Sequence, residues 1–251
     1  MAKELLSKFK PLSAKYCKNW IKKNFLRENE LHNLESLIEI IDLKPGMKVL
    51  DIGSEKAVSA IYLAKEFDVK VWTINSKISA SSNFKRIKEM GCEDSVFPMR
   101  VNERQLPFPV EYFDLILSVD SYMNFRTDFS YSNYISKFLK PGGQMGIVDL
   151  CSNYSKNVEK ENSNENKFNF VQSLEWWYNL WENTDSVNVK ILEIVPENEL
   201  MKELFIINNK TTKRNELLAS EFANDEFSSL NIFRMVAQKI NREINYKFYG
   251  F

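Results

Sequence analysis

The sequence predicts an α/β protein built on a seven-stranded, mostly parallel sheet with helices on both faces. From Met47 onward, short apolar runs alternate with segments whose apolar residues recur at helical spacing. The run Phe113–Val119 is almost continuously apolar, as expected of a strand that is covered on both sides. The segment 43–53, LKPGMKVLDIG, places a turn, a strand and a glycine directly before a helix. That order opens many ligand-binding α/β domains.

Length, charge and cysteine usage limit the class of protein. The chain has 251 residues, enough for one large α/β domain, and 44% of them are hydrophobic. Lys+Arg and Asp+Glu both number 34, so the charge balance does not favour nucleic acid as a partner. The three cysteines are isolated, and we find neither a membrane-length apolar run nor a signal-peptide core. We therefore predict a cytoplasmic protein without a membrane span.

The chain has a single histidine, and this excludes several kinds of catalytic and metal site. His32 falls within a predicted helix, where an exposed position is the favoured interpretation. A histidine-rich metal site is excluded and no CxxC pair replaces it, so we predict no metal site. A Ser-His-acid hydrolase is disfavoured because no GxSxG segment occurs.

The chain divides into a helical cap, one α/β domain and a tail. Residues 1–42 are predicted to be helical, and their early lysines indicate a solvated helix face rather than membrane contact. The domain spans 43–240, includes a polar lid or insertion at 152–169, and precedes a tail at 241–251. Strands are expected at 48–52, 69–74, 96–101, 113–119, 145–150, 187–195 and 231–239. Helices are expected at 58–67, 79–90 and 131–139, the last ended by a KPGG turn, and after a capping Ser173.

Three strings carry a resemblance to a known family. LKPGMKVLDIG, FDLILSVDS and KFLKPGGQMGIVD together resemble the class I S-adenosylmethionine-dependent methyltransferases, especially the branch of ubiquinone/menaquinone biosynthesis. The resemblance covers about 37–150. It implies a Rossmann-like sheet with a reversed last hairpin, S-adenosylmethionine as cofactor and a small-molecule acceptor.

The resemblance also implies cofactor-binding positions, and the chain departs from several of them. In the loop D-x-G-x-G-x-G, Asp51 and Gly53 match, whereas Glu55 and Ala57 stand where glycines are expected. Glu55 would bring a negative charge to the place of the cofactor's own carboxylate, unless its side chain turns outward.

Two further departures concern the nucleoside end of the cofactor. The acid that accepts hydrogen bonds from the ribose is replaced by Asn75, whose amide oxygen is a weaker acceptor. The acid that contacts the adenine is replaced by Val101, with Asn102 as its substitute if the register shifts.

The acceptor side is expected after the fourth strand, because ligands bind at the carboxyl ends of such sheets. Asp120 would orient or deprotonate the acceptor, or else cap the following turn, and we weigh these two roles equally. The candidate lining residues are Tyr16, Trp20, Ser121, Tyr122, Trp176 and Trp177. For the aromatic residues, core packing is the favoured alternative.

Three functions follow from these patterns. The first is an active methyltransferase that acts on a small molecule, since methyl transfer needs positioning and no histidine. The second is a non-catalytic protein of the same fold that binds a partner or another ligand. The third, a dinucleotide-binding oxidoreductase, is disfavoured because GxGxxG is absent. The altered cofactor positions favour impaired or absent catalysis.

Overall fold

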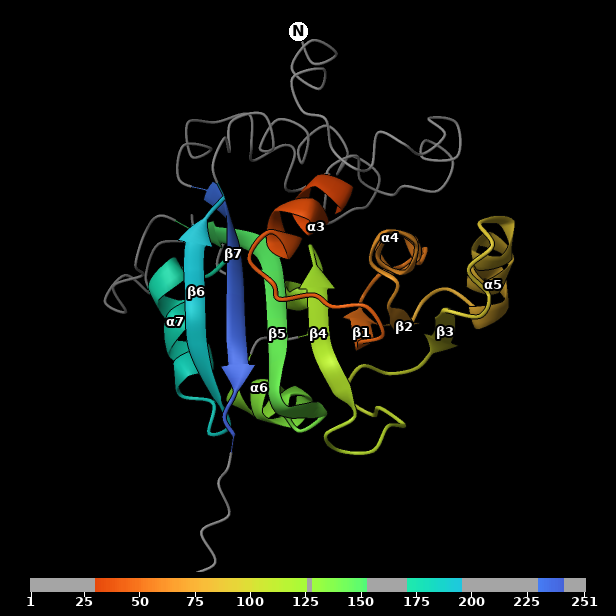
Figure 1. Ribbon diagram of the computed structural model, residues 1–251. Helices are drawn as coiled ribbons and strands as arrows, with labels where there is room; N and C mark the ends of the chain where they lie inside the picture. The colour runs from red at the N-terminus through yellow and green to blue at the C-terminus, as the bar shows by residue number, and fades with distance from the viewer. Residues whose placement is uncertain (1–29, 126–127, 153–170, 196–229, 242–251) are drawn as a thin grey trace, which may run out of the picture.

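The computed structural model describes residues 30–125, 128–152, 171–195 and 230–241 (Figure 1). Its elements are, in chain order, α3 (Glu30–Ile38), β1 (Lys48–Ile52), α4 (Val58–Phe67), β2 (Lys70–Asn75), α5 (Ala80–Glu89), β3 (Val96–Arg100), β4 (Phe113–Val119), η2 (Tyr122–Phe125), α6 (Phe129–Ser136), β5 (Leu139–Ser152), α7 (Leu174–Glu182), β6 (Val187–Ile194) and β7 (Leu230–Lys239). Most of the predicted cap, nearly all of the insertion and nearly all of the tail lie outside the described residues. Within the described part, no helix is both long and apolar enough to cross a bilayer.

The strands form one sheet in the order β3-β2-β1-β4-β5-β7-β6. Neighbouring strands from β3 to β5 run parallel, whereas β7 pairs antiparallel with both β5 and β6. This confirms the predicted fold class and the reversed last hairpin. The chain moves outward in one direction after β1 and in the other after β4, so the strand order reverses between these two neighbours.

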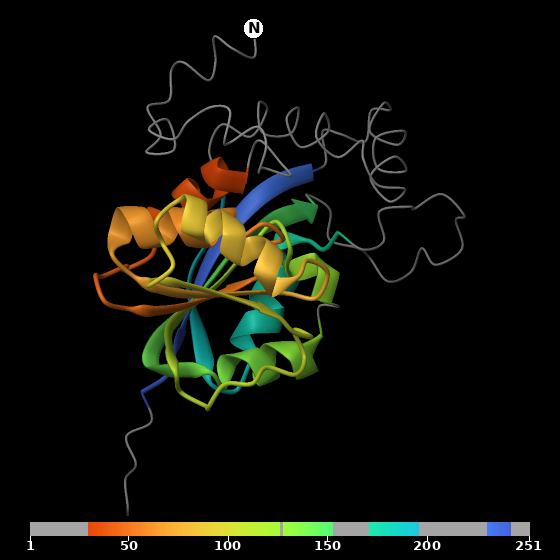
Figure 2. The ribbon, with the colours of Figure 1, turned by 90° about the vertical axis from the view of Figure 1, so that its right-hand side faces the viewer.

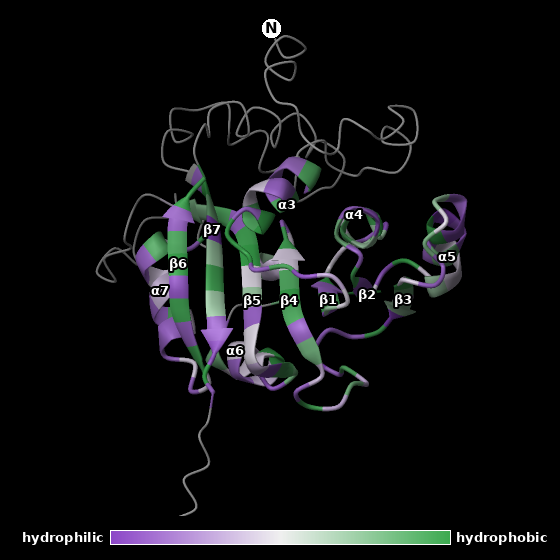
Figure 3. Cartoon of the chain, viewed as in Figure 1, coloured by the Kyte–Doolittle hydropathy of each residue, from purple (hydrophilic) through white to green (hydrophobic). Residues whose placement is uncertain are grey.

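Helices cover both faces of the sheet, as Figure 2 shows with α4 and α5 on one side and α6 and α7 on the other. Alternate residues of each strand face opposite layers. Val49 and Leu117 belong to the cluster under α3 and α4, whereas Leu50 and Ile116 belong to the cluster on the side of α6 and α7. The outermost strand β6 alternates hydrophobic and hydrophilic residues along its length (Figure 3), as expected of an edge strand.

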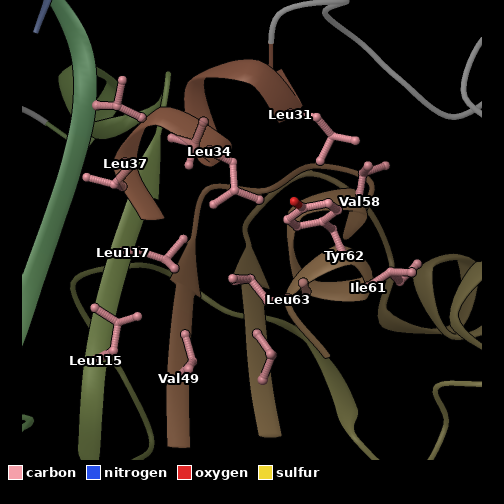
Figure 4. Packing of buried hydrophobic residues seen from close by; sticks show 14 of the residues in the cluster. Leu31, Leu34, Leu37, Val49, Val58, Ile61, Tyr62, Leu63, Leu115 and Leu117 are labelled. Carbon is pink, nitrogen blue, oxygen red and sulfur yellow. The ribbon is translucent and has the colours of Figure 1, made fainter. Parts of the chain in front are cut away.

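The helix α3 packs into the same core as the sheet. Figure 4 shows its leucines Leu31, Leu34 and Leu37 between α4 and strands β1 and β4. Arg234 of β7 also holds this helix, because its Nη1 donates to the Ser36 carbonyl oxygen at 2.6 Å. His32 lies in α3 and is half-buried rather than exposed.

Most predicted helix ends are confirmed. The Ser173 side chain caps α7 by accepting a hydrogen bond from the Trp176 N–H. The Ser79 side chain caps α5 in the same way.

Two predicted boundaries are wrong. The helix predicted at 131–139 begins at Phe129 because the side chain of Asp128 caps it there, and it ends at Ser136. The KPGG segment lies inside β5 rather than forming a separate turn. Between the pairs Phe113–Leu139 and Leu115–Gln144, a single β4 residue opposes residues 140–143, which form a bulge. A Cβ on Gly143 would lie 2.9 Å from the Lys140 carbonyl oxygen, so the bulge needs glycine there.

Candidate functional site

The candidate site lies at the carboxyl ends of β1, β2 and β4. The strand order reverses between β1 and β4, and open α/β sheets bind ligands in the crevice at such a point. The loops that leave these strands are 53–57, 76–79 and 120–125. They bring together most of the positions that the sequence singles out.

A buried polar network fixes the loop after β1. We define it as Asp51, Ser54, Ser59 and Thr73. The Asp51 Oδ2 accepts hydrogen bonds from Ser59 Oγ at 2.6 Å and from Thr73 Oγ1 at 3.3 Å. Burial raises the pKa of Asp51 to about 6, against the opposing effect of these hydrogen bonds. The network ties the end of β1 to the first turn of α4 and to β2.

Two positions of the loop after β1, Gly53 and Ala57, have left-handed backbone angles. Gly53 has φ +86°, and a Cβ there would lie 2.5 Å from Ser121 Oγ, so no larger residue fits. Ala57 has φ 60° and ψ 25°, a left-handed conformation that glycine adopts most readily. Ala57 thus keeps a glycine-like backbone, whereas Glu55 does not have a positive φ.

Glu55 turns toward the next loop. Its Oε1 lies 2.7 Å from Lys77 Nζ, and its side chain is 32% exposed. The backbone carbonyl of Glu55 accepts a hydrogen bond from Asn83 Nδ2 at 3.2 Å, which fixes the loop against α5. The charge that sequence reasoning places against the cofactor is thus paired across the loops after β1 and β2.

Asn75 shapes its own loop. Its Oδ1 accepts hydrogen bonds from the N–H groups of Ile78 at 2.6 Å and Lys77 at 3.0 Å. The residue is buried, and its Nδ2 lies 3.5 Å from the Ser54 carbonyl oxygen. The amide oxygen expected to accept from a ribose therefore already accepts from two backbone donors.

The positions after β3 offer little to an adenine. Val101 is half-buried and packs against the hydrophobic cluster on the side of α6 and α7. The Oδ1 of Asn102, which is exposed, accepts from the Arg104 N–H at 2.9 Å within its own turn. Arg104 Nη2 in turn donates to the Phe125 carbonyl oxygen at 2.8 Å and joins the loops after β3 and β4.

Asp120 is anchored to α3. Its Oδ1 accepts from Asn33 Nδ2 at 2.8 Å, and its φ of 50° is left-handed. Beside it, Ser121 Oγ donates to the Ile52 carbonyl oxygen at 2.9 Å. Both side chains are buried at the end of β4, and the Ser121 hydroxyl lies next to Gly53.

The aromatic candidates divide between the core and its margin. Tyr122 and Trp177 are fully buried, with ring centroids 5.5 Å apart, whereas Trp176 is half-buried beside Trp177. Tyr16 and Trp20 lie outside the described residues.

Sequence reasoning missed the residues that hold the site together: Asn33, Ser59, Thr73, Lys77 and Arg104. The first four contact a predicted position from another element, Asn33 across 87 residues of sequence, and Arg104 joins the loops after β3 and β4. No local pattern marks such partners. Only the place of Lys77, two residues after Asn75, could have suggested a pairing with the neighbouring loop.

The strand order, the reversed last hairpin and the loop after β1 define the class I S-adenosylmethionine-dependent methyltransferase fold. The chain belongs to the family described as mycolic acid cyclopropane synthetase, which matches residues 4–193.

Individual relatives match parts of their own length. Phosphoethanolamine N-methyltransferase 3 of Arabidopsis thaliana is 31% identical over 127 residues, which are 51% of this chain and 26% of that protein. The ubiquinone/menaquinone biosynthesis C-methyltransferase UbiE of Shewanella sp. (strain ANA-3) is 27% identical over 117 residues, 45% of this chain and 46% of that protein. The chain therefore spans about a quarter of the first relative and less than half of the second.

Solved structures agree in fold. Geranyl diphosphate methyltransferase in complex with SAM superposes with a TM-score of 0.66 at 21% identity, over 84% of this chain and 88% of that one. The [4+2]-cyclase SpnF gives 0.70 at 14% identity, over 83% and 81%. At such identities the likeness shows the fold alone, and the reaction depends on the site.

Proposed function

We propose that the chain binds S-adenosylmethionine at the carboxyl ends of β1 and β2, more weakly than a chain with the complete set of contacts. We further propose that it acts on a small molecule, or descends from enzymes that did, with impaired methyl transfer. One observation carries this proposal: Ala57 keeps a left-handed, glycine-like backbone while the Glu55 side chain pairs with Lys77.

The residues fit one end of the cofactor better than the other. Gly53 and Ala57 have left-handed backbone angles, and the N-terminus of α4 suits the carboxylate of the cofactor. At the nucleoside end, the Asn75 oxygen already accepts two hydrogen bonds and Val101 has no polar side-chain atom. This imbalance supports retained but weakened binding.

When bound, S-adenosylmethionine would supply a methyl group on a positively charged sulfur: an acceptor's lone pair would form a bond to the methyl carbon in line as the carbon–sulfur bond breaks, and S-adenosylhomocysteine would leave. The protein needs to position the acceptor and exclude water. Asp120 and Ser121 are the polar side chains at the end of β4 suited to this role, and Asn33 orients the Asp120 carboxylate. The names of the relatives, which include methyltransferases of phosphoethanolamine and geranyl diphosphate, support a small-molecule acceptor.

A second candidate is a non-catalytic protein of the same fold. Four altered positions favour it: Glu55, Ala57, Asn75 and Val101. On this hypothesis the natural chain does not bind the cofactor, and its loops serve another ligand or a partner.

Isothermal titration with S-adenosylhomocysteine separates the two. We expect a dissociation constant in the micromolar range for the natural chain, and about tenfold tighter binding after Glu55→Gly, Ala57→Gly and Asn75→Asp are combined. The gain would come from a second carboxylate oxygen at position 75 and from two restored glycines. The absence of both heat and a thermal shift with the natural chain would contradict the first candidate and leave the second.

A further inference from the structure

The pair Glu55–Lys77 points to a role for Lys77 that the family resemblance does not contain. We propose that Lys77 is a positioning residue that determines whether the site accepts a ligand carboxylate. It does so by holding the Glu55 carboxylate away from the N-terminus of α4. This inference rests on the proposed function and names the residue that compensates for the least conservative change in the loop.

The location of Glu55 makes such compensation necessary. It lies two residues before Ala57, from which α4 begins. The first N–H groups of a helix and its dipole attract an anion, so an unpaired Glu55 would compete with a ligand carboxylate there or repel it. The Lys77 ammonium, 2.7 Å from Glu55 Oε1, neutralises this charge and draws it toward the loop after β2.

Hydrogen bonds fix the backbone at both residues of the pair, Lys77 and Glu55. The Lys77 N–H donates to Asn75 Oδ1, and the Glu55 carbonyl oxygen accepts from Asn83 Nδ2. Asn75 therefore has a second purpose: it shapes the turn that presents Lys77 to Glu55.

An exposed ion pair contributes little to folding, and the Lys77 side chain is 71% exposed. Its effect should therefore appear in ligand binding rather than in stability. Exposed charge pairs of this kind change an equilibrium by up to about fivefold.

The test compares S-adenosylmethionine with decarboxylated S-adenosylmethionine, which differ in the carboxylate alone. We expect Lys77→Met to weaken binding of the first ligand about fivefold and to leave binding of the second unchanged or tighter. Adding Glu55→Gln should remove the loss. Lys44→Met is the matched control, because Lys44, in the turn before β1, pairs with Asp42 at 2.7 Å and its side chain is 64% exposed, against 71% for Lys77.

The outcomes are distinguishable by titration calorimetry. Equal weakening of both ligands, or a loss that persists with Glu55→Gln, would overturn the role of Lys77 and leave the proposed function intact. If neither ligand binds to the natural chain or to any variant, the proposed function fails and this inference fails with it.

Discussion

Two buried regions on opposite sides of β1 differ in whether their polar atoms have hydrogen-bond partners. In the polar network, the Asp51 carboxylate and the Ser59 hydroxyl are joined at 2.6 Å, and Ser54 Oγ lies 2.9 Å from the same hydroxyl. In the aromatic cluster, defined as Tyr122, Tyr131, Trp177 and Trp181, each side chain buries a polar atom without a hydrogen-bond partner among the described residues. Directed hydrogen bonds hold the network, whereas ring packing holds the cluster.

The unsatisfied polar atoms of the aromatic cluster lower the stability of the fold, and the packing of its rings offsets this loss. An unsatisfied buried donor costs about 1–3 kcal/mol, so the cluster gives up stability at several positions. Large buried rings offset this cost through their apolar area, and contacts such as the T-shaped pair of Tyr122 and Trp177 add to it. The sheet thus positions the site with hydrogen bonds on one side and supports it with rings on the other.

Trp177→Ala should break the cluster most severely. The side chain is fully buried against Phe233, with ring centroids 4.7 Å apart, so its removal leaves a large cavity. We expect a loss of about 4 kcal/mol in the free energy of unfolding, measured with urea. Trp176→Ala, at a half-buried neighbour, is the control and should cost less than half as much. Equal losses would contradict the packing account.

Asp51→Asn tests the charge that the network carries. The pKa of this carboxyl rises from an ordinary 3.8 to about 6 in the folded chain, so the folded state binds its proton more tightly than the unfolded state. The contribution of Asp51 to the stability of the natural chain should therefore fall as the pH rises from about 4 to about 6, by roughly 3 kcal/mol, and then level off. The variant lacks this fall, so its stability relative to the natural chain should rise over the same interval. Unfolding at pH 4 and pH 7 measures this, and a constant difference would contradict the raised pKa.

A matched pair of hydroxyl deletions sharpens the comparison. Ser59→Ala removes a satisfied donor from the network and should destabilise the chain by about 2 kcal/mol. Tyr122→Phe removes a hydroxyl that has no partner among the described residues, and should be neutral or stabilising by up to about 1 kcal/mol. Thermal and urea unfolding of both variants give the two signs. A loss at Tyr122 as large as that at Ser59 would show that its hydroxyl is satisfied in solution.

Ala57→Gly should have the smallest effect. The left-handed backbone at Ala57 strains an alanine and suits a glycine, so the variant should gain about 1 kcal/mol. Ala60→Gly, inside α4, is the control and should lose about 1 kcal/mol. A loss at both positions would mean that Ala57 is not strained.

The sequence predicted the sheet because hydrophobic periodicity and turn residues are local signals. It correctly placed the strand before Gly53 and the Ser173 cap, since each depends on a few adjacent residues. It missed that Asp128 caps α6 and that the KPGG segment forms a bulge inside β5, because a Pro-Gly-Gly sequence signals a turn whether or not strand pairing continues around it. It also could not predict where Glu55 points, because that direction depends on Lys77, 22 residues further along the chain.

The most direct test of the central claim is a crystal structure of the chain with S-adenosylhomocysteine. We predict density for the ligand over Gly53 and Asn75, with its carboxylate at the N-terminus of α4 and Glu55 still paired with Lys77. Density at another place, or a Glu55 carboxylate occupying the N-terminus of α4 with no ligand beside it, would contradict the account.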